Sequence, residues 1–248
     1  MTDLGCVIAV GGNEDKRGTS DSILGAFAQR AGGTDARIVV IPSASEEPET
    51  RAAQYADVFR ALGAASIRVV HAERGVSKDD LLLIENASGI FVTGGDQQKL
   101  MGHLRNTGCA DAIVDAVRSG AVYAGTSAGA AVVSLRMIAA SKRRRGQDVI
   151  EFGEGLGLVP GVIVDQHFSQ RRRLTRLISA TSTWNLTGVG IDEDTAAVWR
   201  NDGSVEVIGR GAITIVHPEV AAPAPRSYRL HVFESGASAP LRDLLAVR

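Results

Sequence analysis

The chain has few cysteines and no long apolar run. Among its 248 residues only Cys6 and Cys109 are cysteines, too few for a disulfide framework, and Cys6 lies in an apolar stretch typical of a buried strand. These features predict a reduced, cytoplasmic protein. No apolar run reaches the length needed to span a membrane, and the start of the chain lacks the basic and apolar segments of a signal peptide.

The net charge is also close to zero, and aromatic side chains are few. The chain has 27 Lys and Arg against 28 Asp and Glu, a formal net charge of −1, and only 4% aromatic residues. Since no aromatics interleave with the basic residues, binding to nucleic acid is not expected. The H-x-x-x-H and C-x-x-C spacings of metal sites are absent as well. The overall composition, with 44% hydrophobic and 22% charged residues, is typical of an ordinary globular protein.

Short apolar runs alternate with longer amphipathic ones through the first half of the chain. This rhythm predicts an α/β fold, a mostly parallel sheet with helices on both faces, in a single domain spanning residues 1–248. Later runs are separated by turns and predict a C-terminal antiparallel extension, with a surface loop over 218–226. The expected strands are 7–10, 37–41, 66–70, 89–92, 121–124, 162–164, 189–192, 196–199, 205–208 and 227–233, and the expected helices are 22–31, 48–62, 78–86, 97–106, 111–119, 128–138 and 171–182.

A G-x-S-x-G pattern lies between the strand at 121–124 and the next helix. This pattern, with Ser127 at its centre, is that of a nucleophile elbow on a sharp strand-to-helix turn. The turn would hold the Ser127 hydroxyl outward, and the N–H of Ala128 could stabilise an oxyanion. For this pentapeptide alone, a tight turn without chemistry is the alternative.

A serine nucleophile needs a base, and His167 is the best candidate. It lies at a strand end among polar residues that an ordinary core strand would not carry. His71, His103, His217 and His231 are each better explained by structural or surface roles.

The acid that would orient the base lies in a run of three carboxylates. In an extended segment Glu193 points to one face while Asp192 and Asp194 point to the other, so either Glu193 or the Asp pair faces the site. An α/β-hydrolase that uses Ser127, Asp192 and His217 is a further alternative.

Two segments suggest a negatively charged group near the site. The loop at 93–98 offers amides at a strand end that opens a helix, where they could stabilise an oxyanion; a phosphate loop is less fitting because no Gly-Lys-Ser/Thr follows. If Ser169 caps the following helix, Arg171, Arg172 and Arg173 occupy its first turn, where cations oppose the helix dipole. That cost indicates a carboxylate partner for the arginines.

Six ordered segments resemble cyanophycinase, a serine exopeptidase related to the aspartyl dipeptidases. The resemblance runs from about residue 5 to 210, and the last forty residues carry none of it. The matching segments are 11–16, 91–97, 125–131, 155–158, 165–168 and 190–196.

The resemblance implies a fold like that of the class I glutamine amidotransferases and a triad of Ser127, His167 and Glu193. It implies that the amides of Gly95 and Ala128 bind the oxyanion. The substrate would be multi-L-arginyl-poly-L-aspartate, cleaved to β-Asp-Arg dipeptides without a metal or organic cofactor, by an enzyme that is often a homodimer. The implied substrate-binding residues are Gln97, Asp165, Gln166, Arg171, Arg173 and Arg176.

The chain departs from the family pattern between the serine and the histidine. Residues 140–147 form a short basic segment with Lys142 to Arg145, where family members tend to carry a small, polar loop. If it borders the pocket, this segment would repel arginine side chains. A dipeptidase or acyl-transfer enzyme acting on a small aspartyl compound, or a non-catalytic carboxylate-binding relative, are therefore alternatives. Asn13 also replaces the alanine that is usual there.

Overall fold

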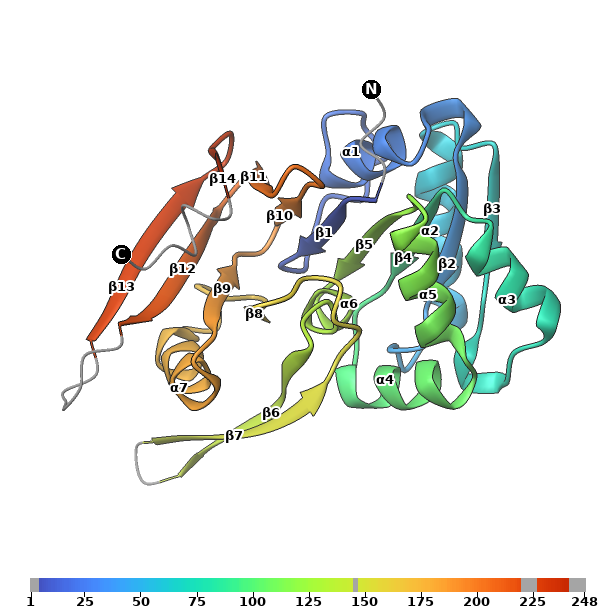
Figure 1. Cartoon of the computed structure of the whole chain (residues 1–248). Helices are drawn as coiled ribbons and strands as arrows, with labels where there is room; N and C mark the ends of the chain where they lie inside the picture. Colours follow the sequence, from blue (N-terminus) through green and yellow to red (C-terminus); the bar gives the residue numbers. More distant parts are fainter. Residues whose placement is uncertain (1–4, 145–146, 220–226, 241–248) are drawn as a thin grey trace.

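An eight-stranded sheet forms the centre of the molecule, in a computed structural model that describes residues 5–144, 147–219 and 227–240. Its strand order is β14-β11-β10-β1-β5-β4-β2-β3 (Figure 1). The strands are β1 (Val7–Val10), β2 (Arg37–Ile41), β3 (Ser66–Val69), β4 (Gly89–Val92), β5 (Val122–Thr126), β10 (Thr195–Trp199), β11 (Ser204–Gly209) and β14 (Ser238–Pro240). The neighbours among β1 to β5 pair in parallel, and β10, β11 and β14 extend the sheet antiparallel.

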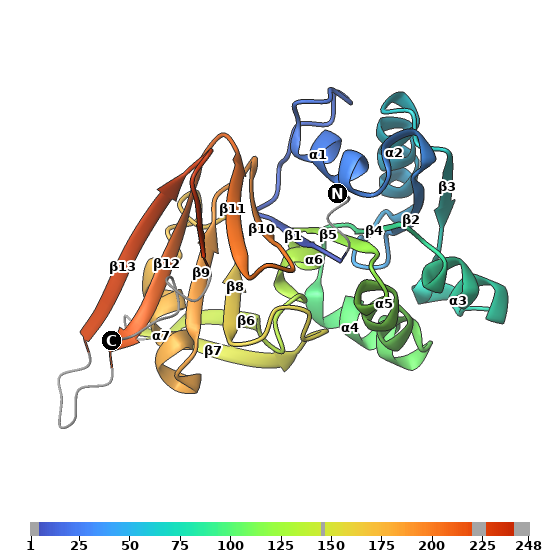
Figure 2. The same ribbon diagram turned by 45° about the horizontal axis from the view of Figure 1, so that its top comes forward.

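Helices cover both faces of the parallel part, as Figure 2 shows. Helices α1 and α2 pack on one face, and α3, α4 and α5 on the other. The helices are α1 (Ile23–Arg30), α2 (Pro48–Ala61), α3 (Lys78–Glu85), α4 (Gln97–Asn106), α5 (Cys109–Arg118), α6 (Ala128–Ala131) and α7 (Leu174–Trp184). The predicted α/β fold with a mostly parallel sheet is therefore confirmed. No helix within the described segments is both long and apolar enough to cross a membrane.

The few aromatic residues gather between α1, α2 and the sheet. The ring centroids of Phe27 and Phe59 lie 5.3 Å apart, and those of Tyr55 and Phe91 lie 4.5 Å apart. All four side chains are buried. This cluster docks the two helices on the sheet by burying apolar area, and it brings Tyr55 to the edge of the sheet where β1, β4 and β5 end.

A second sheet and a hairpin flank the first sheet. The second sheet has the order β13-β12-β9-β8, with strands β8 (Val162–Asp165), β9 (Thr187–Ile191), β12 (Ala212–Glu219) and β13 (Ser227–Glu234). Helix α7 connects the parallel strands β8 and β9 and packs on this sheet. The hairpin pairs β6 (Arg136–Arg144) with β7 (Gln147–Glu154) and extends outward from the body of the molecule (Figure 1).

The helix expected over 128–138 is wrong beyond its first turn. Helix α6 ends at Ala131, and β6 begins at Arg136. Between them the Ser134 hydroxyl accepts the Val164 N–H at 3.0 Å, which ties the chain to the second sheet and directs it into a strand. Residues 140–144 and 147 of the basic segment consequently lie in the strands β6 and β7. Residues 145 and 146, and the side chains at 143–148, lie outside the described residues.

The helix expected over 171–182 begins later than predicted. Helix α7 starts at Leu174, and its N-cap residue is Arg173, without a side-chain cap. The three preceding arginines lie in a turn in which the N–H of Arg172 donates to Ser169 and Arg172 has a φ of +51°. Arg171, Arg172 and Arg173 thus precede the helix and do not occupy its first turn, contrary to the prediction from the sequence. Strand β12 was also missed; it includes Pro218 and Glu219, and residues 220–226 of the expected loop lie outside the described residues.

Candidate active site

The carboxyl ends of β1, β4 and β5 meet at one edge of the main sheet and open into a cleft of about 1000 Å³. Ligand sites of open α/β sheets lie at this edge. The cleft is lined by Gly12, Asn13, Glu14, Lys16, Ala44, Ser45, Glu46, Glu47, Arg51, Tyr55, Gly94, Gly95, Asp96, Gln97, Thr126, Ser127, Ala139, His167 and Glu193. It thus contains the predicted serine, histidine and acid.

Ser127 occupies the sharp turn between β5 and α6. Its backbone has φ +51° and ψ −104°, a conformation that L-residues seldom adopt. The turn is closely packed, because a Cβ at Gly125 would lie 2.3 Å from the Gly129 carbonyl oxygen, and one at Gly129 would lie 2.4 Å from the Val92 carbonyl oxygen. Glycine on both sides of the serine is therefore a steric requirement of this turn.

Three side chains form a hydrogen-bonded series at the cleft. The Ser127 Oγ lies 2.9 Å from Nε2 of His167, and Nδ1 of His167 lies 2.7 Å from Oε1 of Glu193. The imidazole packs against the backbone of Gly12, where a Cβ would lie 2.3 Å from the ring. The N–H of His167 donates to the Gly11 carbonyl at 2.8 Å, so the end of β1 fixes the histidine.

The histidine is partly buried, and this lowers its pKa. The hydrogen bond that His167 donates to Glu193 opposes the shift, while the positive charges of Arg171 and Arg173 add to it, and the pKa of His167 remains below its ordinary value of 6.5. Its neutral form, which can accept a proton, therefore predominates at neutral pH.

The structure distinguishes the three acids that the sequence left open. Glu193 contacts His167, whereas Asp192 accepts the N–H of Ser169 at 3.0 Å. Asp194 accepts the N–H of Asp15 at 3.0 Å. Alternation along the segment thus directs Glu193 to the cleft and the two aspartates away from it.

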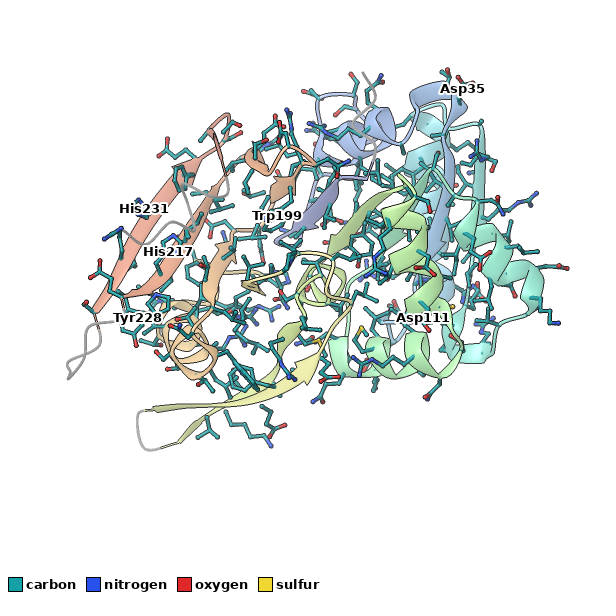
Figure 3. All side chains as sticks on the ribbon, viewed as in Figure 1. Asp35, Asp111, Trp199, His217, Tyr228 and His231 are labelled. Atoms are coloured by element: carbon teal, nitrogen blue, oxygen red, sulfur yellow. The ribbon has the colours of Figure 1, made fainter. Side chains whose placement is uncertain are left out.

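His217 does not belong to this site. It lies in β12, 4% exposed, with Nδ1 3.1 Å from the Thr187 hydroxyl. Figure 3 shows it beside His231 on the β12–β13 pair. The alternative that combined Ser127, Asp192 and His217 is therefore wrong.

Two backbone amides adjoin Ser127 at the cleft. Gly95, at φ +147°, passes so close to the Ala44 carbonyl that a Cβ would lie 1.8 Å from its oxygen. Ala128 is the first residue of α6. Within the part of the chain that the structure describes, neither the Gly95 nor the Ala128 N–H donates to a protein acceptor. Both amides are thus available to an anion.

Of the six predicted substrate-binding residues, only Gln97 lines the cleft. Its Nε2 donates to the carbonyls of Ile138 and Ala139, each at 2.9 Å, and so attaches α4 to the base of the hairpin. Gln166 is buried beside the cleft, and Arg171 is exposed.

The remaining three form an ion-pair cluster beneath the turn that follows β8. Asp165 is fully buried, 3.2 Å from Nη1 of Arg173 and 2.9 Å from Nε of Arg176. Arg176 also donates to the Ser141 hydroxyl of the hairpin at 3.0 Å. The carboxylate expected near the arginines is therefore supplied, for Arg173 and Arg176, by Asp165 of the protein itself.

Glu14, which the sequence patterns did not single out, lines the cleft and is 3% exposed. Its carboxylate accepts the Thr126 hydroxyl at 2.6 Å and the Tyr55 hydroxyl, and Lys16 Nζ lies 3.1 Å away. Burial raises the pKa of Glu14, but the Lys16 charge and the two hydroxyl donors lower it more, so the pKa lies below its ordinary value. The sequence signal that could have pointed to Glu14 is the segment at 11–16, but its role depends on Tyr55, which is distant in the sequence.

Comparison with known proteins shows the family to which the chain belongs. Residues 7–208 match the model of the family described as peptidase family S51. Cyanophycinase from Geminocystis herdmanii is 42% identical over 93% of this chain and 91% of its own length, and that from Synechococcus elongatus is 44% identical over 86% of this chain and 68% of its own. The crystal structure of a peptidase from an acI-B1 Actinobacterium superposes with a TM-score of 0.69 at 23% identity, covering 96% of this chain and 97% of the other. The chain belongs to peptidase family S51.

Proposed function

We propose that this protein is a serine exopeptidase that hydrolyses cyanophycin, multi-L-arginyl-poly-L-aspartate, to β-Asp-Arg dipeptides. The observation that carries the proposal is the series of Ser127, His167 and Glu193 joined at 2.9 Å and 2.7 Å. Relatives named cyanophycinase, 42% identical over most of their length, support the choice of substrate.

The proposed reaction is acyl transfer through a Ser-His-Glu triad. His167 Nε2 accepts the Ser127 proton while Oγ attacks the scissile carbonyl carbon, and Glu193 holds the imidazole through Nδ1. The amides of Gly95 and Ala128 hold the oxyanion. His167 then gives its proton to the leaving amine, and water, deprotonated by the same imidazole, releases the acyl group and restores the serine.

The charges lining the cleft suit a substrate that carries both signs. Glu46, Glu47 and Asp96 offer carboxylates to guanidinium groups, and Lys16 and Arg51 offer cations to carboxylates. Each β-Asp-Arg unit presents a guanidinium and a carboxylate. An uncharged substrate would leave both sets of side chains without a charged partner, and a purely acidic one would leave the carboxylates without a partner.

Of the substrate-binding residues implied by the resemblance, the proposal keeps Gln97 and Arg171 for contact with the substrate. Gln97 lines the cleft, and Arg171 lies close enough to His167 for its charge to act on the imidazole. We assign Asp165, Arg173 and Arg176 to holding the turn that carries His167 and Gln166, since the Arg173 guanidinium also donates to the Gln166 carbonyl. The proposal also retains a homodimer and a cytoplasmic location, which light scattering and cell fractionation would test.

The experiment that tests the function compares the purified chain with its Ser127→Ala variant on insoluble cyanophycin. Ser179→Ala is the matched control, because that hydroxyl lies on α7 and donates only within its helix. We expect β-Asp-Arg, detected by mass, from the wild type and the control, and a loss of about 10⁵ to 10⁶-fold in kcat for Ser127→Ala with unchanged thermal stability. Release by Ser127→Ala at the wild-type rate would contradict the mechanism. If no dipeptide is released but a fluorophosphonate still labels Ser127, the substrate is a smaller aspartyl compound.

A further inference from the structure

One cation of the cleft is held in place by the protein more firmly than a surface lysine. Lys16 follows β1, and its side chain is 22% exposed where it lines the cleft with Ser127. Its ammonium donates to the Glu14 backbone carbonyl at 3.1 Å and lies 3.1 Å from the Glu14 carboxylate. The same ammonium lies 5.4 Å from the centre of the Tyr55 ring, within cation–π range. These contacts hold the Lys16 ammonium in the cleft that Ser127 also lines.

The group that holds Lys16 is itself anchored by two other segments. Glu14 accepts hydroxyl hydrogen bonds from Thr126, at the end of β5, and from Tyr55, in α2. Thr126 precedes Ser127 directly in the chain. The position of the Lys16 charge is consequently set by the same elements that set the position of Ser127.

The Lys16 ammonium has more donors than the protein uses. An ammonium carries three N–H donors, and within the described segments its two acceptors are both atoms of Glu14. The remaining donor belongs to a group that lines the cleft. A preorganised, partly buried ammonium with an uncommitted donor is suited to a carboxylate, because the new hydrogen bond is charge-assisted and little side-chain entropy is lost on binding.

The other cations near the site are less available. Arg173 and Arg176 are paired with buried Asp165, and Arg171 does not line the cleft. Arg51 lines the cleft but is exposed on α2, with a neutral hydrogen-bond partner in Gln54 at 3.2 Å. Among the described cations that line the cleft, Lys16 is therefore the partly buried one, whereas Arg51 is exposed.

Resting on the function proposed above, we propose that Lys16, positioned by Glu14, binds a free carboxylate of the substrate and so contributes to specificity for the β-Asp-Arg unit. That unit offers two such groups once released, the arginyl carboxylate and the aspartyl α-carboxylate. Binding involves one charge-assisted hydrogen bond and no covalent step.

The test measures binding of the dipeptide to a protein that cannot turn over substrate. In the Ser127→Ala background, calorimetry gives the Kd of β-Asp-Arg with Lys16, with Lys16→Met and with Lys16→Arg. We expect Lys16→Met to weaken binding about 10- to 100-fold, the range for a hydrogen bond to a charged group, and Lys16→Arg to restore most of it. Lys99→Met is the control, since Lys99 is exposed on α4 outside the cleft.

Because Lys16→Met alone leaves Glu14 as a buried carboxylate without a counter-charge, the double variant Glu14→Gln/Lys16→Met is measured beside it. Both charges are then removed together, and the same loss of affinity is expected in a folded protein.

Two monoamides of the dipeptide identify the carboxylate. The amide that removes the group contacted by Lys16 is expected to bind equally well with and without the lysine. The inference is overturned if Lys16→Met leaves the Kd of β-Asp-Arg unchanged, or if neither amide abolishes the difference, in which case the lysine acts only on the fold. If β-Asp-Arg does not bind the Ser127→Ala protein at all, the proposed function is wrong and the inference fails with it.

Discussion

Single residues around the cleft have backbone conformations that side chains usually avoid. Among the described residues, six non-glycine residues have a positive φ, and Asn13, Ser127, His167 and Asp194 of these lie in or beside the cleft. Asparagine and aspartate tolerate this region, but serine and histidine are strained there, at a cost of order 1–3 kcal/mol each. Surrounding hydrogen bonds hold these residues in their strained conformations. For example, the N–H groups of His167 and Asp194 donate to the carbonyls of Gly11 and Gly12, respectively, each at 2.8 Å.

The pH dependence of the reaction follows from the environment of His167. The protonated imidazole cannot accept the Ser127 proton, and burial places the pKa of His167 below 6.5. We therefore expect kcat/KM to be level near pH 7 and to fall as pH decreases, by about tenfold per unit once pH is below that pKa. Initial rates between pH 4.5 and 8 would measure the limb. Circular dichroism at each pH is the control for unfolding, and a limb centred above pH 6.5 with intact fold would contradict the assignment of the base.

At the level of residues, sequence patterns predict those site residues whose signal lies in the adjacent residues of the chain. Ser127 was predicted because its turn needs glycine two positions before and after it, and His167 because polar residues follow its strand. The choice among Glu193 and its two aspartate neighbours stayed open, because alternation gives opposite faces but not which face is the cleft. Glu14 could not be assigned, since its partners Tyr55 and Thr126 come from elements far away in the sequence.

Among the elements, the early strands and helices were predicted well and the segments after Ser127 less so. The parallel strands are apolar runs bounded by clear turns, and helices such as α3 have explicit caps, with the Ser77 hydroxyl accepting the Asp80 N–H at 3.1 Å. The run at 132–139 suits a helix or a strand equally, because a short apolar stretch does not distinguish the two periods. Residues 136–139 of this run form a strand because they pair with β7, with a shift in register between Ile138 and Ala140.

The docking of α7 on β8 depends on Asp165. This carboxylate is fully buried between Arg173 and Arg176, whose side chains are each 13% exposed. Asp165→Asn keeps the shape but leaves two guanidinium groups without a counter-charge, so we expect the free energy of unfolding to fall by about 3–5 kcal/mol. Urea denaturation followed by circular dichroism would measure it.

The matched control for Asp165→Asn is Asp57→Asn, which removes an exposed pair with Arg60 on the surface of α2. It should change the free energy of unfolding by less than about 1 kcal/mol. Equal effects of the two substitutions would show that the cluster at Asp165 does not hold α7 in place.

Over the whole molecule, the chain passes repeatedly between its two larger sheets. It runs from β8 and β9 of the second sheet to β10 and β11 of the main one, returns to β12 and β13 of the second, and then adds β14 beside β11 of the main sheet. The acid of the site lies on the connection between β9 and β10, and the histidine follows β8, while the serine follows β5. The site therefore requires both sheets, and we propose that residues 1–248 fold as the single domain expected from the sequence.

The two tryptophans allow a test of whether the two sheets fold as one domain, because each tryptophan reports on a different sheet. Trp199 lies in β10 of the main sheet, and Trp184 lies at the end of α7 with its ring 5.7 Å from that of Phe152 in the hairpin. The variant Trp184→Phe leaves Trp199 as its fluorophore, and Trp199→Phe leaves Trp184. If the sheets unfold together, the fluorescence of each variant should have the same urea midpoint as its own circular dichroism signal, since one cooperative transition has one midpoint for every probe. A Trp184 signal lost at clearly lower urea than the circular dichroism signal of the same variant would mean that the second sheet unfolds alone. In that case hydrolysis should disappear with the Trp184 signal, because His167 and Glu193 would be lost while Ser127 stayed in place.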